Sequence, residues 1–233
     1  MKKIGETLKK WYGSERFRWL FSLACALVIV GVAASLSTLT FFDNDDLNIA
    51  WALAGYRTGA PSFAHPFINC IMAILTSALY TLLPQLPWWL ILQLVASAAG
   101  MTAVFAAILK IGHKHGVPLL LSLALLAACG AGLFYYGIVL VTFTLSATMA
   151  GAGAVALVLA ADAEDSKKTQ RGYLIGSILL LAVSLLVRNS SGLAAACFVL
   201  GAFVYRAVES RIQKDRATAK RLLAFGAAAI VVC

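Results

Sequence analysis

WWLILQLVASAAGMTAVFAAIL, residues Trp88–Leu109, is an apolar segment that contains no charged side chain. Its length matches the roughly 20 residues that an α-helix needs to cross a bilayer core about 30 Å thick. Of the 233 residues in the chain, 61% are hydrophobic and 12% are charged, and the charges lie in short clusters between similar apolar runs. Soluble domains are roughly half apolar and a quarter charged. The sequence therefore predicts an all-α, polytopic transmembrane helix bundle.

The apolar runs divide the chain into a basic cytoplasmic tail, residues 1–16, and one transmembrane domain, residues 17–233. We expect an outer loop at residues 43–87 and spans at about residues 17–42, 88–109, 117–136, 137–161, 172–187, 192–205 and, incompletely, 222–233. The last run is too short to cross alone, which predicts a fragment of a longer protein or a last helix that packs incompletely. The first run is longer than the apolar core of a signal peptide, which favours an uncleaved span over cleavage near Val32–Ser35.

The basic residues predict which side of the membrane each loop occupies. The net charge is +9, and most of the 19 Lys and Arg residues border apolar runs. The positive-inside rule explains that placement without a nucleic acid partner. If Phe67–Leu83 lies in the outer interface, 17 of the 19 basic residues are cytoplasmic, and only Arg57 and Arg188 are outside. If that run crosses the membrane, only seven of the 19 basic residues are cytoplasmic and 12 are outside. We therefore expect an interfacial amphipathic helix at Phe67–Leu83, a cytoplasmic N-terminus and a plasma-membrane location.

Arg188 interrupts the apolar region between two basic segments. Because both flanking segments are expected in the cytoplasm, two helices must meet near Arg188–Ser191 and return. Gly172–Val187 and Gly192–Tyr205 would each measure roughly 20–25 Å as helices, which is less than the thickness of the bilayer core. We therefore expect Arg188 low in the outer leaflet or in a wet cavity. An ionisable residue at such a depth is a functional candidate.

Asp43, Asp45 and Asp46 follow the first span in FFDNDDLNIAWALAGYRTGAPSFAHPFIN, whereas the other seven acidic residues fall in cytoplasmic segments. Three carboxylates so close together repel one another unless a cation lies nearby. They suit general-base catalysis on an acceptor hydroxyl, or the binding of a divalent metal. The alternative is a solvated helix start, in which Asp43 or Asn44 caps a helix and the acids favour its first turn.

Two guanidinium groups are expected on the same side of the membrane as these carboxylates. Arg57 and Arg188 can each hold a phosphate through two parallel hydrogen bonds, and His65 lies in the same outer loop. Together they predict a site for a lipid phosphate. As alternatives, Arg57 extends its charge to the lipid headgroups, and His65 is an ordinary loop residue.

Three short stretches resemble the GT-C superfamily of polytopic glycosyltransferases, which use polyprenyl-phosphate sugars. They are NDD at Asn44–Asp46, AHPFIN at Ala64–Asn69 and LYTLLPQLPWW at Leu79–Trp89, the last being similar to bacterial members. The resemblance covers the N-terminal part of a usual member. It implies Asp45 or Asp46 as the catalytic base and an arginine such as Arg188 near the donor phosphate.

We therefore expect a glycosyltransferase of the cell envelope that moves a sugar to a hydroxyl acceptor on the outer face. Asp43, Arg57, His65 and Arg188 are assigned to substrate binding. The alternative is a polytopic membrane protein without chemistry, such as a transporter, a flippase or a structural subunit. Carriers usually place ionisable groups near the middle of the membrane, and no predicted span has an acidic residue at its centre. That pattern favours the enzyme.

Overall fold

A computed structural model of the chain describes residues 11–42, 44–57, 59–63, 67–161, 165–212 and 216–232. The elements in chain order are α2 (Glu15–Leu36), β1 (Thr40–Phe41), α3 (Asn44–Ala54), α4 (Cys70–Leu82), α5 (Trp88–Lys114), α6 (Leu119–Cys129), the π-helical turn η1 (Gly130–Phe134), α7 (Tyr135–Val139), β2 (Leu140–Val141), α8 (Phe143–Ala160), α9 (Lys167–Val187), α10 (Asn189–Ile212) and α11 (Arg216–Val232). Within these ranges six helical segments are long and apolar enough to cross a membrane. The predicted all-α membrane bundle is confirmed.

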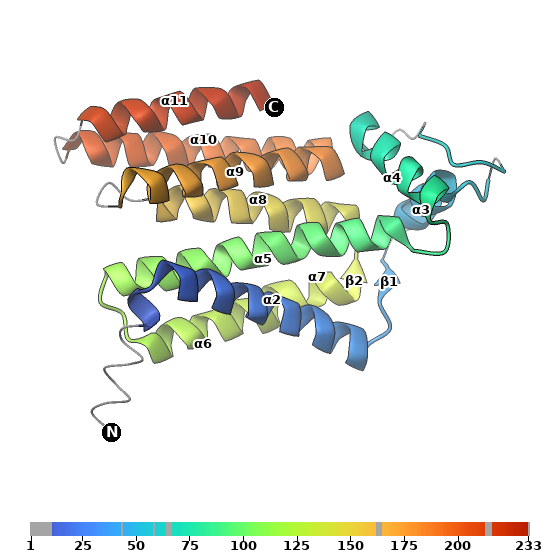
Figure 1. The fold of residues 1–233 in the computed structure, drawn as a ribbon, viewed down its shortest axis with the longest axis horizontal. Coiled ribbons are helices and arrows are strands. Elements are labelled where there is room, and N and C mark those ends of the chain that lie inside the picture. Colours follow the sequence, from blue (N-terminus) through green and yellow to red (C-terminus); the bar gives the residue numbers. More distant parts are fainter. Residues whose placement is uncertain are drawn as a thin grey trace.

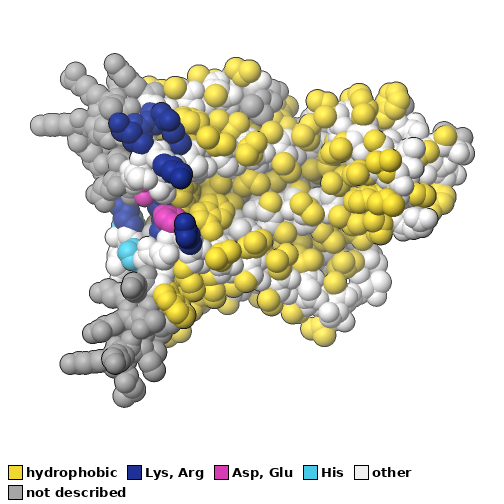
Figure 2. Space-filling model, in the orientation of Figure 1, with side chains coloured by type: hydrophobic (Ala, Val, Ile, Leu, Met, Phe, Trp, Pro, Cys, Tyr) yellow, Lys and Arg dark blue, Asp and Glu magenta, His cyan; other side chains and the backbone are white. Residues whose placement is uncertain are grey.

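The long helices lie side by side, and α3 and α4 sit together at one end of them (Figure 1). We call this end, which also carries the α9–α10 turn at Arg188, the loop end. The opposite end carries Glu15, Lys110, Asp165 and Arg206, and we call it the basic end. Charged side chains gather there around a hollow, while apolar side chains cover most of the remaining face (Figure 2). Such an apolar surface fits contact with lipid, so the chain is a multi-pass membrane protein.

Glycines let α5 and α8 approach each other closely. A Cβ atom on Gly100 of α5 would lie 2.2 Å from the carbonyl oxygen of Met149 in α8. One on Gly153 of α8 would lie 2.9 Å from the backbone of Gly100. Small residues at such crossings allow the van der Waals packing that drives helix association in lipid. The α5–α8 pair therefore forms the packed centre of the bundle.

Two predicted spans end elsewhere than expected. The sequence placed the break between the third and fourth spans at Tyr136–Gly137, but α7 continues to Val139 and α8 begins at Phe143. Thr142 defines that start, because its Oγ1 accepts a hydrogen bond from the N–H of Leu145 at 3.0 Å. This is a side-chain N-cap, which satisfies a backbone donor that the helix leaves unpaired.

The two short arms expected around Arg188 are full-length helices. α9 has 21 residues and α10 has 24, about 31 Å and 36 Å at 1.5 Å per residue. Both extend into basic segments that the apolar runs excluded, since a helical backbone satisfies its own hydrogen bonds whether its side chains are apolar or charged. The expectation that these two helices are too short to cross was therefore wrong, which removes the reason for placing Arg188 low in the outer leaflet. Arg188 lies in the turn at the loop end, where it lines a cavity.

The predicted outer loop, residues 43–87, contains two short helices. α4 has 13 residues, about 20 Å, and is not among the segments long enough to cross. One face packs inward through Met72, Thr76 and Tyr80, and the outward face exposes Ile71 and Ile74. An apolar outward face on a helix too short to span suits a position in the membrane interface.

A two-residue parallel bridge fixes where the loop begins. Thr40 pairs with Leu140 and Phe41 with Val141, joining β1, just after α2, to β2, just before α8. At the other end of α3, Gly55 adopts φ +86°, and a Cβ atom there would lie 2.6 Å from Ala60. Only glycine adopts this turn without strain. These two constraints set α3 against the first residues of α8.

Candidate functional site

Asp46 is fully buried, and its carboxylate accepts hydrogen bonds from two helices of the bundle. Oδ1 accepts from Trp89 Nε1 at 3.1 Å and from Gln93 Nε2 at 2.9 Å, both on α5. The backbone N–H of Phe143 is shared between Oδ1 at 3.2 Å and Oδ2 at 3.3 Å. Because Phe143 is the first residue of α8, the carboxylate also lies at the positive end of that helix dipole. Asp46 thus ties α3 to α5 and α8.

Asp45 lies in the first turn of α3 and is only half-buried. Consecutive residues of a helix point about 100° apart, so the two neighbouring carboxylates lie in different surroundings. Asp43 and His65, which the sequence also assigned to the site, fall outside the described residues. Of the predicted carboxylates, Asp45 is therefore the described one that solvent and a substrate can reach.

Arg57 follows α3 and is exposed. Its Nη2 donates a hydrogen bond to Oδ1 of Asn48 on α3. That contact holds the Arg57 guanidinium against α3, and no described contact joins it to Arg188. The structure therefore does not bring the two predicted phosphate ligands together.

Arg188 occupies the turn between α9 and α10, next to the start of α8. Its Cζ lies 4.5 Å from the centroid of the Phe143 ring, and its Nε donates to Ser190 Oγ at 3.0 Å. A guanidinium over an aromatic face is attracted by the ring quadrupole. Phe143 therefore contacts Asp46 through its backbone and Arg188 through its side chain, and this brings two of the predicted site residues to one place.

A second contact joins the outer loop to the same turn. Asn69 caps α4 by accepting a hydrogen bond from the N–H of Ile71 at 3.0 Å. Its Nδ2 donates to Oδ1 of Asn189, the first residue of α10, at 3.3 Å. The residue next to Arg188 is thus held by the loop helix α4.

Tyr80 and Trp89 complete the packing beneath the loop. The Tyr80 hydroxyl accepts a hydrogen bond from the N–H of Trp89 at 3.2 Å. Burial raises the pKa of Tyr80 above its usual value, because a low-dielectric environment disfavours the charged form. Both side chains belong to an apolar cluster that also includes Ile49 and Phe143. The loop end is therefore a packed structure around Asp46.

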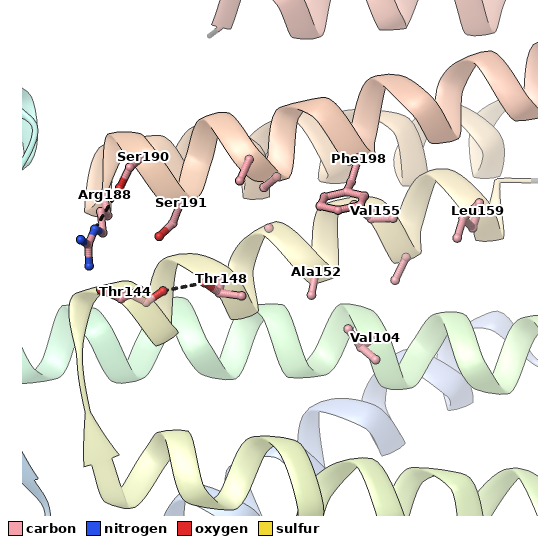
Figure 3. A pocket seen from close by; sticks show the side chains of 14 residues that line it. Val104, Thr144, Thr148, Ala152, Val155, Leu159, Arg188, Ser190, Ser191 and Phe198 are labelled. Atoms are coloured by element: carbon pink, nitrogen blue, oxygen red, sulfur yellow. Dashed lines mark hydrogen bonds between the residues drawn. The ribbon is translucent and has the colours of Figure 1, made fainter. Parts of the chain in front are cut away.

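A cavity of about 670 Å³ runs along α8 and α10 from this turn. Its polar lining is at the loop end, where Arg188 lies with the hydroxyl residues Thr144, Ser190 and Ser191 (Figure 3). Farther along, the walls are apolar side chains such as Val155 and Phe198. We call this cavity the α8–α10 groove. A cationic end and a long apolar body suit an amphiphile with an anionic head.

The described residues contain no group of three His, Cys, Asp or Glu side chains that could hold a metal ion. A divalent metal beside Asp45 would therefore need further ligands from residues outside those ranges or from a substrate. The metal stays a prediction.

Sequence reasoning missed Phe143, Trp89 and Gln93, although they hold the site together. Gln93 offered a signal, since it is the one side-chain amide in the segment Trp88–Leu109. A polar group inside a span usually has a partner. Phe143 offered none, because its role depends on a contact with α3, 97 positions earlier in the chain.

Comparisons with protein-family models, with curated proteins and with solved structures find no match to this chain.

Proposed function

We propose that this protein is a membrane glycosyltransferase that moves a sugar from a polyprenyl-phosphate donor to a hydroxyl acceptor on the outer face. The observation that carries the proposal is the α8–α10 groove, with the Arg188 guanidinium at its polar end. Phe143 contacts both Asp46 and Arg188, so α3, the helix that carries Asp45, lies at that same end of the bundle. The resemblance of Asn44–Asp46 and Ala64–Asn69 to the GT-C superfamily agrees with this arrangement.

The proposal includes an orientation in the plasma membrane. The basic end faces the cytoplasm, because the positive-inside rule retains Lys and Arg on that side. The loop end then faces outward, with α4 in the outer interface. A donor in the outer leaflet reaches Arg188 with its phosphate while its polyprenyl chain follows Val155 and Phe198 along the groove.

Asp45 is the catalytic base in this mechanism. The acceptor hydroxyl gives its proton to the Asp45 carboxylate while its oxygen bonds to the anomeric carbon from the face opposite the phosphate. The bond between that carbon and the phosphate oxygen breaks, and both electrons leave with the polyprenyl phosphate. The configuration at the anomeric carbon is inverted. Arg188 stabilises the charge that develops on the leaving phosphate, which we expect to be the larger catalytic effect.

Asp46 has a different role. It is fully buried and already accepts three donors, so a substrate hydroxyl does not reach it. We assign it to positioning, because it holds α3, and with it Asp45, against α5 and α8. Arg57 and His65 are retained as binding residues for the sugar or for a headgroup.

The test is a transferase assay on the full-length protein in liposomes with labelled polyprenyl-phosphate sugars. We expect Asp45→Asn and Arg188→Ala each to lower turnover by about 100-fold or more. Arg57→Ala removes the other outer arginine, and we expect a much smaller effect on turnover, because Arg57 is assigned to binding and not to the leaving phosphate. Turnover by Asp45→Asn equal to that of the wild type would remove the mechanism.

A lipid carrier without chemistry is the second candidate. It is favoured by one observation: Leu159 lines both the α8–α10 groove and the cavity at the basic end, so cationic side chains lie near both ends of the groove. Transfer of a labelled polyprenyl phosphate between leaflets, with no sugar transfer in the first assay, would support the carrier over the enzyme.

A further inference from the structure

A groove of about 670 Å³ opens between α2 and α9 at the basic end, away from the residues assigned to glycosyl transfer. Both helices begin at that end (Figure 1). The described residues that line the groove are Glu15, Arg16, Trp19 and Leu20 from α2, and Lys168, Thr169, Gly172 and Tyr173 from α9. We call it the α2–α9 groove.

Tyr173 joins the two walls of the groove. Its hydroxyl donates a hydrogen bond to Glu15 Oε2 at 2.8 Å, and its ring centroid lies 5.7 Å from that of Trp19. The Glu15 carboxylate also pairs with Arg18 at 2.8 Å and lies 3.6 Å from Lys110 Nζ. The one carboxylate among the described lining residues is therefore neutralised within the bundle, so it does not repel an anion that enters the groove.

Each of the two helices brings one cation to the groove. Arg16 of α2 and Lys168 of α9 both line it, and both are exposed. Neither side chain makes a hydrogen bond or an ion pair with the part of the chain that the structure describes. A guanidinium and an ammonium group on two walls suit one phosphate, the guanidinium through two parallel hydrogen bonds and the ammonium as a point charge. These two charges are therefore available to a ligand.

The same faces of α2 and α9 continue as apolar stripes toward the loop end. Residues that follow at four, seven and eleven positions lie on one face of a helix. Counted from the cation, these positions hold Leu20, Leu23 and Leu27 on α2, and Gly172, Ile175 and Leu179 on α9. All of them are exposed. Each cation thus lies at the basic end of an exposed apolar stripe, which matches a ligand that has an anionic head and aliphatic chains.

We propose that the α2–α9 groove binds an anionic phospholipid of the inner leaflet. Its phosphate lies between Arg16 and Lys168, and its acyl chains follow the two apolar stripes. Trp19 lies at the level of the headgroup, where Trp side chains are enriched. Basic pockets between membrane helices on the cytoplasmic side recognise such headgroups. The site is at the opposite end from Arg188 and does not depend on glycosyl transfer, so either assignment can fail alone.

The experiment measures lipid retention by the purified full chain in nanodiscs that contain equal amounts of phosphatidylcholine and phosphatidylglycerol. Native mass spectrometry after release gives the ratio of the two lipids bound. We expect phosphatidylglycerol to be enriched on the wild type. Arg16→Gln and Lys168→Gln should each lower that enrichment roughly fivefold, which is the contribution of one basic residue near an anionic surface, and the double variant should abolish it.

The matched controls are Lys167→Gln and Arg171→Gln. They remove the same charges from exposed residues of α9 that are not among the lining residues, and we expect them to change the enrichment by less than about twofold. Gly172→Leu fills the groove without changing the charge, and it should also lower the enrichment. A Cβ atom there would meet no atom within 4 Å, so the fold is retained, and circular dichroism checks this for every variant.

Equal retention of the two lipids by the wild type would overturn the proposal. A control variant that lowers the enrichment as much as Lys168→Gln would show a general effect of net charge and would refute the groove as the site. Unchanged enrichment in Gly172→Leu would also refute it, since the lipid would then not occupy the groove. Complete displacement of the lipid by inorganic phosphate at a low millimolar concentration would show that the cations recognise a free anion instead.

Discussion

Replacing Asp46 by alanine should destabilise the protein more than any other substitution in the outer loop. The change leaves three buried donors without their acceptor: Trp89 Nε1, Gln93 Nε2 and the N–H of Phe143. Each buried donor left unpaired costs about 1–3 kcal/mol, and a water in the vacated space recovers part of that. We therefore expect a loss of about 3–5 kcal/mol. For a chain of this size, that corresponds to a fall of roughly 6–20 °C in Tm.

The assay is thermal unfolding in detergent, followed by size-exclusion chromatography of the heated protein. Asp45→Ala is the matched control, since Asp45 is half-buried in the same helical turn, and we expect it to change stability by less than about 1 kcal/mol. Asp46→Asn should fall between the two, because it retains an acceptor oxygen but presents an NH₂ group to buried donors. If Asp46→Ala and Asp45→Ala unfold at the same temperature, Asp46 does not hold the loop to the bundle.

Three further changes test the packing around the site. Gly100→Val should lower Tm by several degrees, because its side chain overlaps the backbone of α8, while Gly132→Val, in open space, serves as the control. A double-mutant cycle of Asn69→Ala and Asn189→Ala should give a coupling of about 0.5–1.5 kcal/mol in thermal unfolding, and additive effects would contradict their hydrogen bond. Phe143→Leu removes the ring beneath the guanidinium and should raise the KM for the donor about 2- to 30-fold; an unchanged KM would separate that ring from donor binding.

The helix bundle could be predicted from the apolar runs, because crossing a bilayer requires about 20 apolar residues and internal backbone hydrogen bonds. The ends of the helices could not. Lys167–Arg171 and Arg206–Ile212 are helical although charged residues interrupt their apolar character. Charge marks where the chain meets water, whereas a helix begins or ends where a backbone group finds a hydrogen-bond partner outside the helix. At the start of α8 that partner is the Thr142 side chain.

The candidate site could be predicted only in part. The sequence indicated that carboxylates and Arg188 would meet at one end of the bundle, and Phe143 joins Asp46 to Arg188 there. It could not separate the roles of Asp45 and Asp46, which are adjacent residues of one type. Their difference arises from the rotation between successive helical positions and from donors on α5 and α8 that are distant in the chain.

The β1–β2 bridge makes the site sensitive to the thickness of the membrane. α2 leads directly into Thr40 and Phe41, whose partners Leu140 and Val141 precede the first turn of α8. A thinner bilayer tilts a long helix. Any tilt of α2 therefore shifts Phe143 at the start of α8, whose ring lies beneath the Arg188 guanidinium. We expect donor turnover to pass through an optimum across a series of lipids of increasing acyl length, and a flat response would show that the bridge does not transmit this strain.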